Sequence, residues 1–189
     1  MNKILTNYLD DNFNKDFKWK IAVFYFSCYG AFSYYYLTNE ALLKLEGESI
    51  VKILTIITVG FLFGNITTFP FAFLLRFIAK MFHVQSSYKD LIKSLMIAYK
   101  PHLLTLLLII CRIIIAPDSK IQLAPDSIGL LVLFLMIINL LIAILGIISL
   151  ILLFKGLMKV QNLTLGRTVL YYLIASIAFS PVYLLLIKL

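Results

Sequence analysis

Long apolar stretches without charge recur along the chain. Four of them contain no Asp, Glu, Lys or Arg: residues 21–39, 53–75, 127–154 and 168–187. About 20 helical residues are needed to cross the roughly 30 Å hydrocarbon core of a bilayer. The apolar residues run on without the alternation, over about ten positions, that marks a transmembrane β-strand. This pattern predicts four membrane-spanning helices.

A fifth segment, residues 88–116, has a polar first half and an apolar second half. Its middle reads "AYKPHLL", with Lys100, Pro101 and His102 in succession. Because proline lacks an N–H and disfavours a regular helix around it, we expect a junction at Pro101 between an amphipathic lead-in and a short span. The Lys100 ammonium would then reach the cytoplasmic surface by extending along its aliphatic chain.

The predicted fold class is therefore all-α: a polytopic membrane protein with a bundle of five transmembrane helices and a short N-terminal amphipathic interfacial helix. Residues 20–188 form one transmembrane domain in this interpretation. Its expected spans are about 20–38, 50–80, 88–116 with the junction at Pro101, 127–154 and 168–187.

Residues 1–19 are expected to form an amphipathic helix on the cytoplasmic surface. Apolar residues recur there at spacings of three to five positions and polar residues fill the gaps, as in a helix with one apolar face. Trp19 stands at the end of this segment, where an interfacial anchor belongs. Two interpretations remain open: the helix lies on the membrane surface, or it docks a partner.

Composition supports the membrane assignment, and charge sets the orientation. Of the 189 residues 62% are hydrophobic and 14% charged, and the mean hydropathy is +0.98; soluble domains carry about 25% charged residues. The net charge of +8 follows the positive-inside rule, since the excess of Lys and Arg lies in the N-terminal segment and the second and fourth loops. We therefore expect a cytoplasmic (inner) membrane protein with its N-terminus in the cytoplasm and its C-terminus outside. Anionic lipid headgroups, rather than nucleic acid, are the expected partner of this charge.

Catalytic chemistry finds little support in the sequence. The four charge-free runs and the apolar half of the fifth segment contain no Asp or Glu, which proton-coupled carriers and ion pumps usually need within the membrane. The chain has two histidines and no pattern typical of a zinc hydrolase or a phosphate-binding loop. We expect no enzyme activity, no catalytic residue, no cofactor and no metal site.

The remaining polar residues near the membrane form a candidate polar or partner site, and two glycines form a candidate packing site. Gly60 and Gly64 are four residues apart, which lets a neighbouring helix approach closely. A polar side chain in hydrocarbon needs a hydrogen-bond partner, either from another helix or from a substrate. The polar candidates are Asn65, Lys100, Pro101, His102 and Asn139.

The segment "YKDLIKS…AYKPHLL" resembles the third helix of the Yip1 domain family of integral membrane proteins. In that family an amphipathic lead-in and a tyrosine shortly before a proline open this helix, and Tyr99 and Pro101 match those positions. The linker "FKGLMKVQNLTLGRT" is similar to the family's polar connector before the last span, and the resemblance covers about residues 18–188. Eukaryotic relatives have a long polar N-terminal region and act in vesicle trafficking with small GTPases. This chain has about 19 residues there, as in a bacterial-type member.

Two functional hypotheses follow. The leading one is a non-enzymatic membrane protein of the Yip1 type, a scaffold or accessory subunit that acts through helix–helix contacts with a protein partner or with further copies of itself. The alternative is a small-molecule or lipid transporter subunit, in which Asn65, Lys100, His102 and Asn139 would line a polar cavity. The position of Lys100 and His102, in a cavity or at headgroup level, distinguishes the two.

Overall fold

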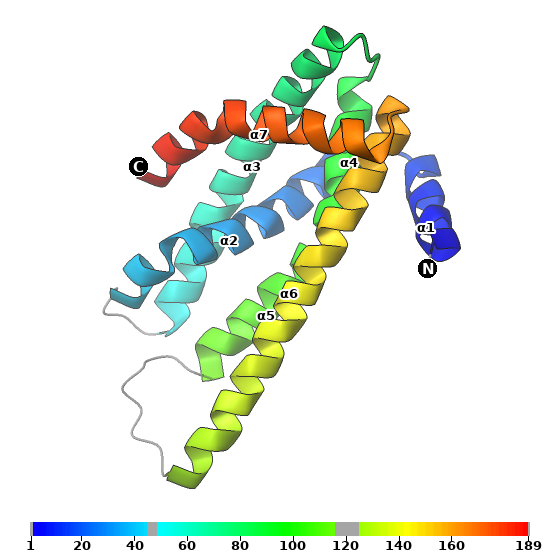
Figure 1. Cartoon of the computed structure of the whole chain (residues 1–189). Helices are drawn as coiled ribbons and strands as arrows, with labels where there is room; N and C mark the ends of the chain where they lie inside the picture. Colours follow the sequence, from blue (N-terminus) through cyan, green and yellow to red (C-terminus); the bar gives the residue numbers. More distant parts are fainter. Residues whose placement is uncertain (1, 45–48, 116–124, 189) are drawn as a thin grey trace.

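The computed structural model describes residues 2–44, 49–115 and 125–188, and all secondary structure within them is helical (Figure 1). The predicted boundaries at residues 1 and 116 lie outside the described residues. The described residues form seven helices: α1 (Asn2–Asn14), α2 (Trp19–Lys44), α3 (Ser49–Met81), α4 (Tyr88–Tyr99), α5 (His102–Ile115), α6 (Pro125–Gln161) and α7 (Leu165–Lys188).

Four stretches of described helix are long and apolar enough to cross a membrane: Ile50–Met81, Tyr88–Ile115, Gly129–Gln161 and Leu165–Leu185. This is one fewer than the five that we expected. The difference lies in α2, the expected span at 20–38, which does not reach the same hydropathy because five of its residues are tyrosines. The protein is a polytopic helical membrane protein with four candidate spans, to which α2 and the short α1 are added.

The short helix α4 lies at the centre of the molecule. Every residue from 91 to 99 is buried, including Lys93 and Ser94, because α1, α2, α3 and α6 all pack around this helix. Its amphipathic pattern therefore does not mark a helix with one face exposed to solvent. The polar residues of α4 are instead enclosed by neighbouring helices, and Figure 1 shows α4 behind α6 and α7.

Helices α2 and α3 pack against each other over much of their length. The contact depends on glycine: a Cβ atom added at Gly64 would overlap the carbonyl oxygen of Phe26, and one added at Gly30 would overlap the backbone of Gly60 and Gly64. An added Cβ at Gly60 would overlap Ala31. Small residues thus bring the two backbones together, which is the usual means of helix association in lipid.

The buried apolar side chains form two clusters along the bundle. The larger includes α4 together with parts of α1, α2, α3, α6 and α7. The smaller cluster joins α5 to the second half of α2 and to the first halves of α3 and α6, with Ile109 and Ile142 among its members. The break at Lys100 and Pro101, between α4 and α5, falls between the two clusters.

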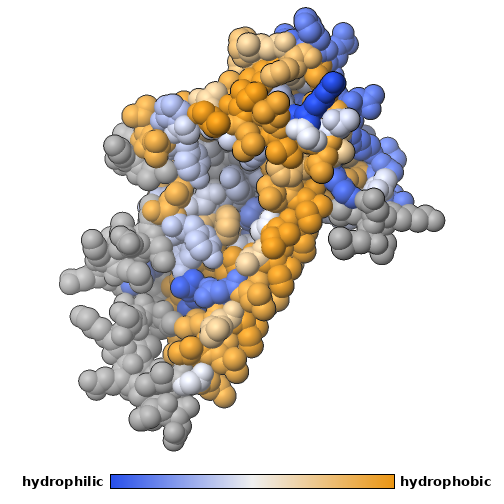
Figure 2. Space-filling model, viewed as in Figure 1, coloured by the Kyte–Doolittle hydropathy of each residue, from blue (hydrophilic) through white to orange (hydrophobic). Residues whose placement is uncertain are grey.

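The surface is apolar along α6 and hydrophilic near α1 (Figure 2). Leu130, Met136, Leu140 and Ile147 are among the exposed side chains of α6. That helix has 37 residues and a length of about 55 Å at ~1.5 Å per residue, so it exceeds the thickness of a bilayer core and must tilt or protrude.

Candidate functional site

The Asn65 side chain forms hydrogen bonds at the contact between α2 and α3. Its Nδ2 donates to Ser27 Oγ of α2 at 3.0 Å and to the carbonyl oxygen of Phe61 in its own helix at 2.7 Å. The side chain is half-buried, one turn away from the Gly60 contact. In this position Asn65 links two helices.

His102 lies at the break between α4 and α5 and is 4% exposed. Its Nε2 is 3.0 Å from Ser149 Oγ of α6, and that hydroxyl is 2.7 Å from the carbonyl oxygen of Ala98. Because the serine hydrogen goes to the carbonyl, the imidazole must donate through Nε2, which makes Nδ1 the unprotonated nitrogen. The rings of Tyr29 and Phe32 lie beside the imidazole, with centroids at 5.2 and 4.6 Å. His102 therefore fastens the break in this helix to α6.

Lys100 points toward α1 rather than into a cavity. Its Nζ donates to Asn12 Oδ1 and lies over the rings of Tyr8 and Tyr25, at 5.7 and 6.0 Å from their centroids. Burial, followed by the proximity of Tyr25, raises the pKa of the Tyr8 phenol above its ordinary value. Pro101 follows directly and is half-buried.

Two further lysines contact the N-terminal helix α1. Lys93 Nζ donates to the carbonyl oxygens of Phe13 and, at 2.6 Å, Lys15, at the carboxyl end of α1, where a cation complements the helix dipole. Lys159 of α6 forms an ion pair with Asp10 and lies 4.9 Å from the centroid of the Phe13 ring. The N-terminal helix is therefore docked on α4 and α6 by lysines from both.

Asn139 lies on the exposed side of α6, where its Oδ1 accepts a hydrogen bond from Arg112 of α5 at 3.0 Å. The four residues that would line a polar cavity in the transport hypothesis thus have four separate sets of partners. Asn65 bonds to α2, Lys100 to α1, His102 to α6 and Asn139 to α5. The structure does not bring them together.

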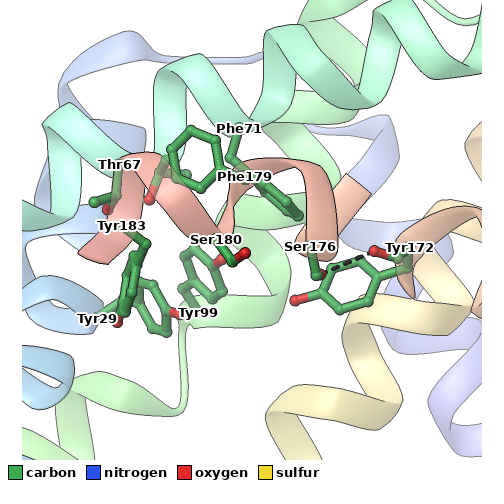
Figure 3. A pocket seen from close by; sticks show the side chains of 10 residues that line it. Tyr29, Thr67, Phe71, Tyr99, Tyr172, Ser176, Phe179, Ser180 and Tyr183 are labelled. Atoms are coloured by element: carbon green, nitrogen blue, oxygen red, sulfur yellow. Dashed lines mark hydrogen bonds between the residues drawn. The ribbon is translucent and has the colours of Figure 1, made fainter. Parts of the chain in front are cut away.

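A pocket of about 220 Å³ lies elsewhere, between α2, α3, α4 and α7 (Figure 3). Its walls carry aromatic rings and hydroxyl groups and no ionisable side chain other than tyrosine. A periodic signal for it exists in the sequence, because five lining positions of α7 share one helix face. The lining residues are Tyr29, Thr67, Thr68, Phe71, Tyr99, Tyr172, Ser176, Phe179, Ser180 and Tyr183.

A second, more open pocket of about 590 Å³ lies at the junction of α3 and α4. Arg76, Lys80 and His83 line it together with the polar residues that precede α4. This basic surface suits the anionic headgroups expected from the charge distribution. Among the residues that the structure describes, no group of three or more His, Cys, Asp or Glu side chains could hold a metal ion.

Comparison with known proteins gives one family. The family model described as the Yip1 domain matches residues 7–187, nearly the whole chain. No curated protein and no solved structure matches. The match includes the break at Pro101, the glycine contact of α2 with α3 and the pocket beside α7. This chain belongs to the Yip1 domain family of integral membrane proteins.

Proposed function

We propose that this protein is a non-enzymatic scaffold or accessory subunit of the cytoplasmic membrane, acting through contacts of its helices with a protein partner or with further copies of itself. Members of the Yip1 family are generally non-enzymatic membrane proteins. The observation that carries the proposal is the pairing of its intramembrane polar groups. Asn65 with Ser27, His102 with Ser149 and Asn139 with Arg112 each join two helices of the bundle.

Polar groups paired in this way stabilise an assembly of helices, whereas a transport path needs them free to exchange partners with a substrate. Because α1 is docked on α4 and α6, its outward side forms a surface of fixed position, which this proposal places in the cytoplasm. Its outward residues include Asp11 and Asn14, both exposed, while its inward residues contact Lys93 and Lys100. A partner that recognises this face would bind without first having to order the helix.

The proposal includes an orientation. The basic residues at the α1 end, among them Lys80 and Lys159, favour a cytoplasmic N-terminus. With α2 as a fifth membrane helix beside α3, the C-terminus lies outside. Support for a membrane position of α2 comes from its glycine contact with α3, since Gly30 meets the middle of a candidate span.

Affinity capture from native membranes with quantitative mass spectrometry tests the scaffold role. We expect one partner, or a second, differently tagged copy of this chain, in stoichiometric amount. The double variant Lys93→Met/Lys100→Gln should reduce recovery several-fold if the partner binds the docked α1. The matched control is Lys80→Met, which replaces an exposed lysine in the second pocket. Absence of any stoichiometric partner from the wild-type sample would contradict the scaffold role.

The transport alternative keeps one specific observation in its favour, the 220 Å³ pocket beside α7. The four residues first assigned to a cavity do not line it. A transporter built on this pocket would therefore use Tyr99 and the hydroxyl groups of α3 and α7 instead. Uptake of a substrate by vesicles containing the purified protein would distinguish this function from a scaffold.

A further inference from the structure

The pocket between α2, α3, α4 and α7 lies at membrane depth. Thr68 comes from the middle of the candidate span Ile50–Met81, and Ser176 from the middle of Leu165–Leu185. Ser180 lines the pocket and is itself exposed, so the pocket has an open rim beside α7. A molecule dissolved in the bilayer can thus reach the pocket from the side, without crossing an aqueous phase.

The pocket has flat walls. The Tyr29 and Tyr99 rings are stacked, with centroids 4.0 Å apart and planes inclined by 7°. The rings of Phe71 and Phe179 meet edge to face at 5.5 Å, and Figure 3 shows the two groups around the same space. Aromatic faces and edges of this kind pack well against another ring.

The hydroxyl groups of the pocket have capacity for a ligand. Thr67, Ser176 and Ser180 donate to carbonyl oxygens of their own helices, at 2.7, 2.8 and 2.8 Å, so their oxygens remain able to accept. Thr68 differs from them: it is 2% exposed, and its hydroxyl has no hydrogen-bond partner among the described residues. A buried hydroxyl is costly without a partner, and a ligand would supply one.

Charge and size restrict the class of ligand. The ten lining residues include no Asp, Glu, Lys, Arg or His, so a phosphate group would lose its hydration without gaining a counter-charge. A cavity of about 150 Å³ accommodates benzene, so the 220 Å³ here suits a single substituted ring and not a whole lipid. Any long alkyl chain of the ligand must lie outside the pocket, between α7 and the surrounding lipid.

We propose that this pocket binds an uncharged, membrane-dissolved molecule that inserts a hydroxyl- or carbonyl-bearing ring between the aromatic walls and bonds to Thr68. This inference goes beyond the scaffold role and does not depend on it. It also requires none of Asn65, Lys100, His102 and Asn139.

Photolabelling of the full chain in phosphatidylcholine nanodiscs tests the proposal. The probe is a dodecylphenol that carries a diazirine, and the labelled peptides are identified by mass spectrometry. We expect labels on the pocket-facing residues of α3 and α7. Unlabelled dodecylphenol should compete with the probe, whereas dodecyl phosphate at the same membrane density should not. Labels spread evenly over the lipid-facing helices, or equal competition by the phosphate, would overturn the proposal.

Three variants refine the test. Thr68→Val keeps the side-chain shape but removes the unpaired hydroxyl, so we expect the protein to stay folded and its apparent affinity for the probe to fall about tenfold, the equivalent of one hydrogen bond. Ser180→Phe should block the pocket from the rim. Ile177→Phe, at a position of α7 that is 70% exposed and outside the lining, is the matched control and should label normally. If Ser180→Phe fails to fold, Thr68→Val still decides: unchanged affinity of this variant would overturn the proposal.

Discussion

Glycine at position 64 shows most directly how single residues determine this fold. Helix α3 meets α2 there with backbone against backbone, and the carbonyl oxygen of Phe26 occupies the place where a side chain would begin. Gly146 of α6 offers the contrast, because nothing lies within 4 Å of a Cβ added there. One glycine is required by its neighbour, whereas the other is tolerated.

Gly64→Ala should therefore destabilise the protein by about 1–3 kcal/mol, the usual cost of overpacking a core. The measurement is thermal unfolding of the purified protein in detergent. Gly146→Ala serves as the control and should be neutral or stabilising by about 0.5–1 kcal/mol, since glycine weakens a helix interior. Equal effects of the two substitutions would show that α2 and α3 leave room for a side chain at position 64.

At the scale of elements, α1 is the helix whose position depends most on a few polar contacts. Lys93 donates to the last carbonyl groups of α1, Lys100 to Asn12, and Lys159 pairs with Asp10. Lys93 is also buried, so its charge relies on those carbonyl oxygens for solvation. The docked helix and the lysines of α4 thus stabilise each other.

Lys93→Met should release α1 while leaving the rest of the bundle folded. The chain between α1 and α2 contains Lys15 and Lys18, and we expect trypsin to cleave it several-fold faster in the variant. Gel analysis of a proteolysis time course with inverted membrane vesicles measures this rate. Lys80→Met, away from α1, should behave as the wild type. An unchanged cleavage rate in Lys93→Met would mean that apolar contacts such as those of Phe13 hold α1 without the lysine.

The elements themselves could largely be read from the sequence, whereas their environment could not. Hydropathy is a local property, so the spans predicted at about 50–80 and 168–187 correspond to α3 and α7. The burial of α4 depends on four other helices, and its lysine-bearing sequence resembles that of a surface helix. The pocket escaped prediction for the same reason: Thr68 and Tyr99 lie far apart in sequence and meet only through the packing of α3 on α4. The tyrosines of α2 lower its hydropathy, so the absence of charge alone did not make it one of the four candidate spans.

At the scale of the whole molecule, the orientation in the membrane can be tested with two cysteines. Lys80→Cys lies at the basic end of α3 and Ile115→Cys at the far end of α5, and both positions are exposed. In a Cys28→Ala/Cys111→Ala background, a membrane-impermeant maleimide added to intact cells should label position 115 and not position 80. This follows from the positive-inside rule, because the basic residues lie at the end of the bundle that contains position 80. The reverse pattern would contradict the proposed orientation, and labelling of both positions after permeabilisation is the control.

The break at Lys100 and Pro101 has a thermodynamic consequence. It separates a large cluster around α4 from a small one around α5, although both are built on the same α2, α3 and α6. Cooperative unfolding requires that one part cannot open without the other, and here the parts are connected by continuous helices and by the ring of His102, which lies between Tyr29 of the larger cluster and Phe32 of the smaller one. Increasing denaturant should therefore loosen α5 and the N-terminal half of α6 first and leave the region around α4 intact, so that the protein unfolds in two steps.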